Sequence, residues 1–143
     1  MKRSDNKMGI FDRLKRGKQT SKEEYSGIVS NARKNSMTAV EYGKSFQKNF
    51  DFSAKSIGEL EEILDYYAED LLESRPTENQ IWSMSLIFGS YLGEVMLKNG
   101  LSKRGYCWGI QDTGTIPLLM AGNEKYITPV DKGYKRLVNG AED

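Results

Sequence analysis

Residues 77–100 read TENQIWSMSLIFGSYLGEVMLKNG and form the longest apolar run in an otherwise hydrophilic chain. Thr77 and Gln80 have the spacing of a capping box, in which each side chain satisfies a backbone N–H of the first helical turn. Gly100 stands where a residue with a left-handed backbone commonly ends a helix. Between them, apolar residues occupy nearly every side. We therefore predict a central helix at about 77–99 that other elements cover on several sides.

A second helix is predicted just before the central one, at 56–74. Ser56 and Glu59 repeat the capping-box spacing, and apolar residues recur three and four positions apart along the segment. Its other face is acidic and carries Glu59, Glu61, Glu62, Asp65, Glu69, Asp70 and Glu73. The residue before Pro76 avoids the helical conformation, so the helix stops there. The two helices are expected to form an antiparallel hairpin.

The segments on either side of this hairpin complete the predicted fold. Ser36 is expected to cap a helix at about 37–49 whose inward side chains are Met37, Val40, Phe46 and Phe50. After the central helix the apolar residues alternate, which predicts a small three-stranded antiparallel meander at about 105–128. A proline in the first turn opens a last helix at 129–139. The predicted fold class is α+β, with three to four helices packed against the meander.

The charges divide the chain into a basic front and an acidic middle. Residues 1–48 hold 12 Lys/Arg and 5 Asp/Glu (net +7), whereas residues 49–100 hold 3 and 10 (net −7). The front is rich in Lys, Arg, Ser and Asn without a sustained apolar period, so we predict a flexible leader at 1–35 and one domain at 36–143. Residues 8–16 could form a short amphipathic helix that makes at most a weak membrane contact. A frayed terminal helix is the favoured interpretation.

The composition of the 143 residues excludes several classes of function. With 21 basic and 20 acidic residues, the chain has no overall field that would attract nucleic acid, so we do not expect nucleic acid as a partner. The chain has no histidine, which removes Ser–His and Cys–His pairs and every histidine-containing zinc site. We expect no metal and no cofactor. A single cysteine and an N-terminus without the apolar core of a secretory signal favour the cytoplasm.

Glu94 is the first catalytic candidate, because it lies inside the apolar run. Burial would raise the pKa of its carboxyl and suit it to acid–base chemistry. In the alternative interpretation Glu94 is structural, either paired with Lys135 or Arg136 or hydrogen-bonded to a Tyr or Trp side chain. Carboxylates in protein cores more often have such a structural role, so the second interpretation is favoured.

Asp112 is the second catalytic candidate. Residues 112–115 read Asp-Thr-Gly-Thr, which matches the active-site tetrad of aspartic proteases in letters. Those enzymes are all-β proteins, whereas this motif follows a helical half. An Asp-x-Gly turn between two strands is also typical of ordinary hairpins, and we favour that interpretation.

Small residues recur every four positions along the central helix, at Ser85, Gly89 and Gly93. They either let a neighbouring backbone approach closely or line a ligand pocket, and close packing is the favoured interpretation. Cys107, on a predicted strand, is expected to be a small buried side chain.

Four pieces of the chain, at residues 51–57, 88–95, 106–108 and 135–143, resemble a family of small bacterial domains of unknown function. The pieces include Tyr-Leu-Gly-Glu-Val in the central helix, an aromatic strand and the ending Lys-Arg-Leu-Val-Asn-Gly-Ala-Glu-Asp. The resemblance implies a compact α+β domain, sometimes a stand-alone product of a gene beside mobile elements or toxin–antitoxin-like genes. It implies no activity, cofactor or catalytic residue.

The sequence therefore favours a non-enzymatic protein-interaction protein of the immunity or accessory type. Helix 56–74 is the expected docking face for one protein partner, because an acidic surface steers a complementary one. The candidate binding residues are Tyr91, Trp108, Glu62, Asp65 and Glu69. The alternative function is a small enzyme that uses Glu94 or Asp112.

Overall fold

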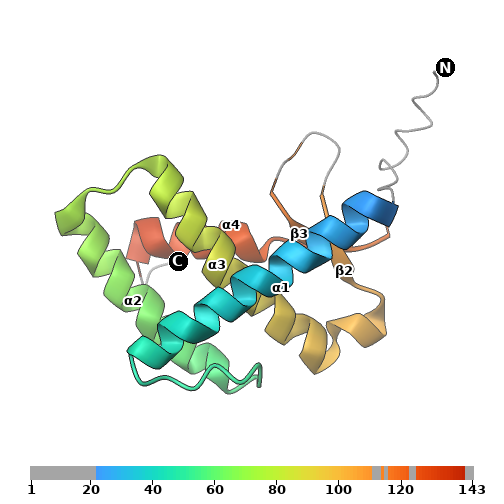
Figure 1. Cartoon of the computed structure of the whole chain (residues 1–143), viewed down its shortest axis with the longest axis horizontal. Helices are drawn as coiled ribbons and strands as arrows, with labels where there is room; N and C mark the ends of the chain where they lie inside the picture. Colours follow the sequence, from blue (N-terminus) through green and yellow to red (C-terminus); the bar gives the residue numbers. More distant parts are fainter. Residues whose placement is uncertain (1–21, 111–113, 115, 123–124, 141–143) are drawn as a thin grey trace.

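The computed structural model describes residues 22–110, 114, 116–122 and 125–140 (Figure 1). These residues form four helices and one antiparallel sheet, so the predicted α+β fold is confirmed. The helices are α1 (Lys22–Ser45), α2 (Ser56–Ser74), α3 (Glu78–Met96) and α4 (Pro129–Asn139), and the strands are β2 (Cys107–Gly109), β3 (Leu118–Ala121) and β4 (Lys125–Ile127). None of the helices in these ranges is long and apolar enough to cross a membrane.

The two ends of α3 follow the local signals in its sequence. The Thr77 hydroxyl accepts a hydrogen bond from the Gln80 N–H (3.1 Å), and the Gln80 side chain accepts one from the Thr77 N–H (2.8 Å), so the capping box is confirmed. At the other end, α3 widens into a π-helical turn, η2 (Leu97–Leu101), followed by a short 3-10 helix, η3 (Ser102–Arg104). Gly100 lies inside this π-helical turn and has a φ of 148°, so the helical backbone is interrupted there, at the position where a glycine is expected.

The predicted start of the first helix at Ser36 is wrong, because α1 begins at Lys22. Ser36 lies inside this helix, where its hydroxyl donates to the Ala32 carbonyl (2.7 Å). Residues 22–35, expected to belong to the leader, are thus helical, whereas residues 1–21, including the predicted amphipathic segment 8–16, lie outside the described residues. Met37 is 53% exposed, so its predicted inward position is also wrong.

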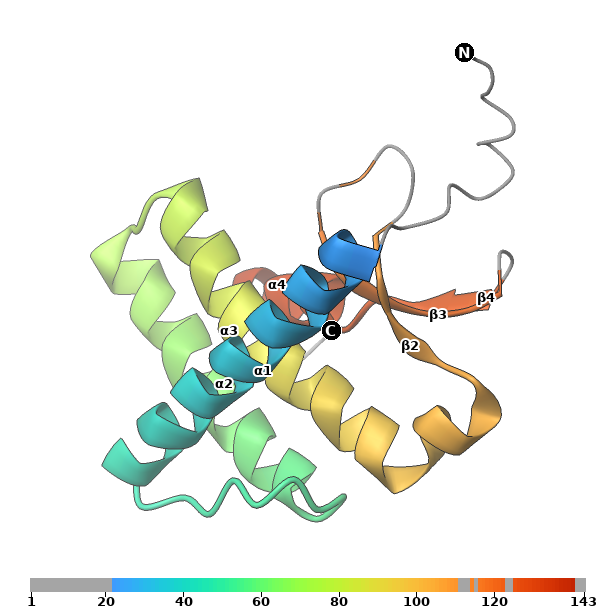
Figure 2. The same cartoon turned by 45° about the vertical axis from the view of Figure 1, so that its right-hand side comes forward.

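The α1 helix packs against α3 through small side chains. Its fully buried positions recur every three or four residues and are Ala32, Ser36, Ala39 and Gly43. α1 is among the most extensive neighbours of α3, and both views show the two helices crossing (Figures 1 and 2). Small residues at such a crossing let the two backbones lie close together.

The small-residue stripe of α3 receives α4 and a tryptophan from the sheet. A Cβ placed on Gly89 would lie 2.5 Å from Val130 Cα, and one placed on Gly93 would overlap the ring of Trp108. Where α4 passes Ser85, it presents Gly133 to the Ser85 carbonyl. The stripe therefore serves close packing, as the sequence predicts.

α2 and α3 run antiparallel (Figures 1 and 2), but α3 packs far more against α1 and α4 than against α2. α2 packs mainly against α4. The predicted capping box of α2 does not form: no side chain caps this helix at Lys55, and the Glu59 carboxylate accepts instead from the Asn49 N–H (2.9 Å). The Ser53 hydroxyl accepts a hydrogen bond from the Ser56 N–H (3.3 Å) and so satisfies a backbone N–H at the start of α2 in place of the capping box.

The sheet has the strand order β2-β3-β4, with Trp108 opposite Leu119 and Leu119 opposite Ile127. Trp108 and Leu119 join Ala32 of α1 in a second core cluster, apart from the main core between the helices. Figure 2 shows this sheet and α2 on opposite sides of the α1–α3 crossing. Cys107, predicted to be buried, is exposed, because the strand turns Trp108 inward instead.

Candidate functional site

Glu94 lies on the last turns of α3 and is half-buried. Its Oε2 accepts a hydrogen bond from the indole N–H of Trp108 (2.8 Å). Gly93, next to it in the chain, leaves the space that the Trp108 ring occupies. Glu94 thus makes the hydrogen bond to Trp that its structural interpretation predicts, and the bond fixes β2 against α3.

Two of the predicted binding residues, Tyr91 and Trp108, are core residues. Tyr91 is 0% and Trp108 2% exposed. The Tyr91 hydroxyl accepts from the Phe52 N–H (2.9 Å) and shares a hydrogen bond with the Ser56 hydroxyl (2.6 Å), and burial raises the pKa of Tyr91. Neither side chain offers a surface to a ligand, which corrects the sequence-based prediction. Asp112, the other catalytic candidate, lies outside the described residues.

Glu62 and Asp65, also predicted to bind a partner, are already paired within the fold. Glu62 pairs with Lys48. Asp65 binds Arg136 of α4 (2.6 Å), whose Nε also donates to Glu61 (2.8 Å). The Arg136 side chain is only 7% exposed. Its burial lowers the pKa, but the two carboxylates outweigh that effect and hold the pKa above the usual value. Glu61 and Asp65 therefore connect α2 to α4, and Glu62 connects α2 to Lys48.

The solvent-facing side of the last turns of α2 has a different character. We call this surface the α2 face; all its side chains are exposed, and they are Tyr66, Glu69, Asp70, Leu72 and Glu73. Leu72 is 79% and Tyr66 52% exposed. Of the predicted binding residues, Glu69 alone belongs to this face. The α2 face combines negative charge with Leu72, which the core does not cover, and with Tyr66, whose ring packs on one side against Phe46 and is otherwise exposed.

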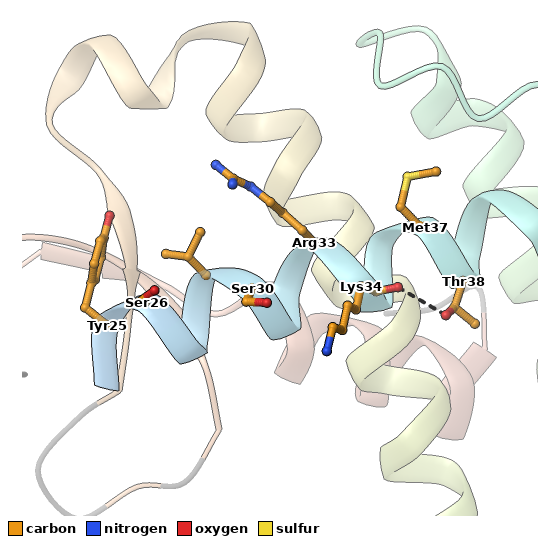
Figure 3. A pocket seen from close by; sticks show the side chains of 8 residues that line it. Tyr25, Ser26, Ser30, Arg33, Lys34, Met37 and Thr38 are labelled. Carbon is orange, nitrogen blue, oxygen red and sulfur yellow. Dashed lines mark hydrogen bonds between the residues drawn. The ribbon is translucent and has the colours of Figure 1, made fainter. Parts of the chain in front are cut away.

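A second surface lies on α1, mostly in the region 1–35 that the sequence assigns to the leader. An open hollow of about 770 Å³ runs along this helix, and we call its lining the α1 face: Tyr25, Ser26, Val29, Ser30, Arg33, Lys34, Met37 and Thr38 (Figure 3). Figure 3 shows Tyr25, Arg33 and Met37 pointing to the same side of the helix. Its open form suits the surface of a macromolecule better than an enclosed small ligand.

The signal that would have found the α1 face is weak in the sequence. The buried side of α1 consists of small residues such as Ala32, Ser36 and Gly43, so it lacks the large apolar period by which a packed helix is usually found. Without that period, Tyr25 looks like an isolated residue in a polar segment, and Met37 is taken for the first inward residue of a shorter helix.

Comparison with models of protein families, with curated proteins and with solved structures gives no match. The resemblance to a bacterial domain family therefore stays a prediction. Within the described ranges, no three Asp, Glu, Cys or His side chains are placed to hold a metal ion.

Proposed function

We propose that this chain is a non-enzymatic protein-interaction protein, of the immunity or accessory type, which docks one protein partner through the α2 face. The observation that carries the proposal is Leu72, a leucine 79% exposed on a helix whose other leucines pack toward the core. Glu69, three residues earlier, neighbours Leu72 on the helix surface, and Tyr66 and Asp70 lie further round the exposed side. Exposed apolar and aromatic side chains on a surface that also carries charge are typical of interaction sites.

The chemistry of this face defines the partner. Glu69, Asp70 and Glu73 are exposed, so they steer a basic surface toward α2 during diffusional encounter. Leu72 and Tyr66 then supply apolar area that is removed from water on binding. The expected partner is a protein with an apolar centre and a basic rim. We also place the chain in the cytoplasm, because its single cysteine allows no intrachain disulfide.

The experiment is affinity capture from the native cell with the full chain as bait, beside a Leu72→Asn variant and a Glu69→Lys/Asp70→Lys variant. Both changes fall on exposed side chains, so the fold is retained. The control is Tyr126→Ser, which removes a half-exposed aromatic residue from β4, outside the α2 face.

The expected result is a stoichiometric partner that the wild-type chain and the Tyr126→Ser control capture and that both α2 variants lose. Binding of the purified partner should weaken with salt, since the charges act at the surface. A partner held equally well by all four proteins, or no stoichiometric partner at all, would overturn the proposal.

A further inference from the structure

We infer that the α1 face of one copy of this chain binds the α2 face of a second copy. The inference rests on the proposed function in that both use the α2 face. It adds a regulatory consequence: the protein partner must compete with a second copy for that face. Charge, apolar content and length of the two surfaces support it.

The charges of the two faces are complementary. Between Tyr25 and Val40 the α1 helix contains two cations, Arg33 and Lys34, and no acidic residue. Both cations are exposed, and Figure 3 shows them on the lining of the hollow. The α2 face presents Glu69, Asp70 and Glu73 and no cation. The two surfaces therefore attract one another, and each repels its own kind.

The apolar content of the two faces also corresponds. The α1 face exposes 41% of Tyr25 and 53% of Met37, and the α2 face exposes Tyr66 and Leu72. Tyr and Met are enriched where proteins meet, and both adapt to a partner surface without a preformed pocket. With a rise of 1.5 Å per residue, the α1 face extends about 20 Å, enough to receive the last three turns of α2.

The two faces of one molecule cannot bind each other. The N-terminal end of α1 and the C-terminal end of α2 lie at opposite ends of the molecule (Figure 1). Contact must form between copies, with the α1 face of one against the α2 face of the next. Such a head-to-tail contact is heterologous, so it extends into chains unless a ring closes.

The test measures the mass of the full chain by sedimentation over a range of protein concentrations, at low and at high salt. The wild-type mass should rise with concentration and fall toward the monomer with salt. Two variants reverse the charges: Arg33→Glu/Lys34→Glu on the α1 face and Glu69→Lys/Asp70→Lys on the α2 face. Each alone should weaken association at least about tenfold, because both of its faces then carry the same sign.

Mixing the two variants gives the decisive result. In the mixture, the negative α1 face of the first variant meets the positive α2 face of the second, so association should return. The control is Lys125→Glu, an exposed cation on β4 outside both faces, which should associate like the wild type. Recovery in the mixture also shows that both variants are folded.

Three results would overturn the inference: a wild-type chain that stays monomeric at every concentration, single variants that associate as the wild type does, or a mixture that stays monomeric. The proposed function is judged separately. The Arg33→Glu/Lys34→Glu variant keeps an intact α2 face and should still capture the protein partner. A wild-type chain that captures the partner but never self-associates would count against the second copy alone, and one that self-associates but captures no partner would count against the protein partner alone.

Discussion

The contact between α3 and α4 can be tested by a single methyl group at Gly89. A Cβ at this position would lie 2.5 Å from Val130 Cα and 2.9 Å from both Pro129 O and Val130 N. All three atoms belong to the backbone, so no side chain can rotate away. Ordinary carbon contacts need about 3.5–4.0 Å. The start of α4 would therefore have to move by about 1 Å, which would disturb the packing of the buried Val130 side chain.

The magnitude follows from two opposing effects. Overpacking a close contact costs about 1–3 kcal/mol, and a backbone clash belongs at the upper end. Replacing glycine by alanine inside a helix stabilises it by about 1 kcal/mol. The Gly89→Ala variant should therefore lose about 2 kcal/mol of unfolding free energy, which corresponds to a fall of roughly 4–8 °C in Tm for a chain of this size.

The assay is urea denaturation followed by circular dichroism, with Gly27→Ala and Gly58→Ala as matched controls. Both control glycines lie on helices, and a Cβ on either would meet nothing within 4 Å. The controls should gain up to about 1 kcal/mol. A Gly89→Ala variant as stable as the wild type, or stabilised like the controls, would refute the close α3–α4 approach.

Three further predictions concern buried polar groups. Arg136 is nearly buried while Glu61 and Asp65 are half-exposed (50% and 51%). The Glu61→Gln/Asp65→Asn variant keeps acceptor oxygens but leaves the guanidinium without a counter-charge, so it should cost about 1–3 kcal/mol in urea denaturation, more than Arg136→Met. Burial raises the pKa of Tyr91 in the native state above 10.0, so its contribution to stability is complete below pH 10 and is lost as the pH rises toward the native pKa. Denaturation at a series of alkaline pH values should show this loss, and Tyr91→Phe should reduce its slope. Glu94→Gln keeps an acceptor for the Trp108 indole and should retain the unfolding free energy within about 1 kcal/mol. Glu94→Leu leaves the indole N–H unpaired and should lose about 1–3 kcal/mol. Equal losses in the two variants would contradict the role of Glu94 as the acceptor for Trp108.

The elements that could be predicted from sequence are those whose signals are local. Thr77 and Gln80 cap α3 through hydrogen bonds within a few residues, and Gly100 interrupts the helical backbone in the turn that follows α3. The meander and α4 were found in the same way, from alternation, turns and a proline at the helix start. The first part of α1 is not predicted, because the side of this helix that packs against α3 is built of small residues such as Ala32 and Ser36. The contact between α1 and α3 is stabilised by the close approach of the two backbones. Small residues make such a contact without leaving a period of large apolar residues in the sequence.

The site could be predicted only in part, because the role of a polar side chain depends on which helix lies beside it. The sequence presents the acids of α2 as one equivalent stripe. The fold divides them: α4 brings Arg136 against Glu61 and Asp65, whereas Glu69 is left facing solvent. The same crossing that makes half of the stripe structural therefore leaves the other half, around Leu72, as the part of α2 that a partner can reach.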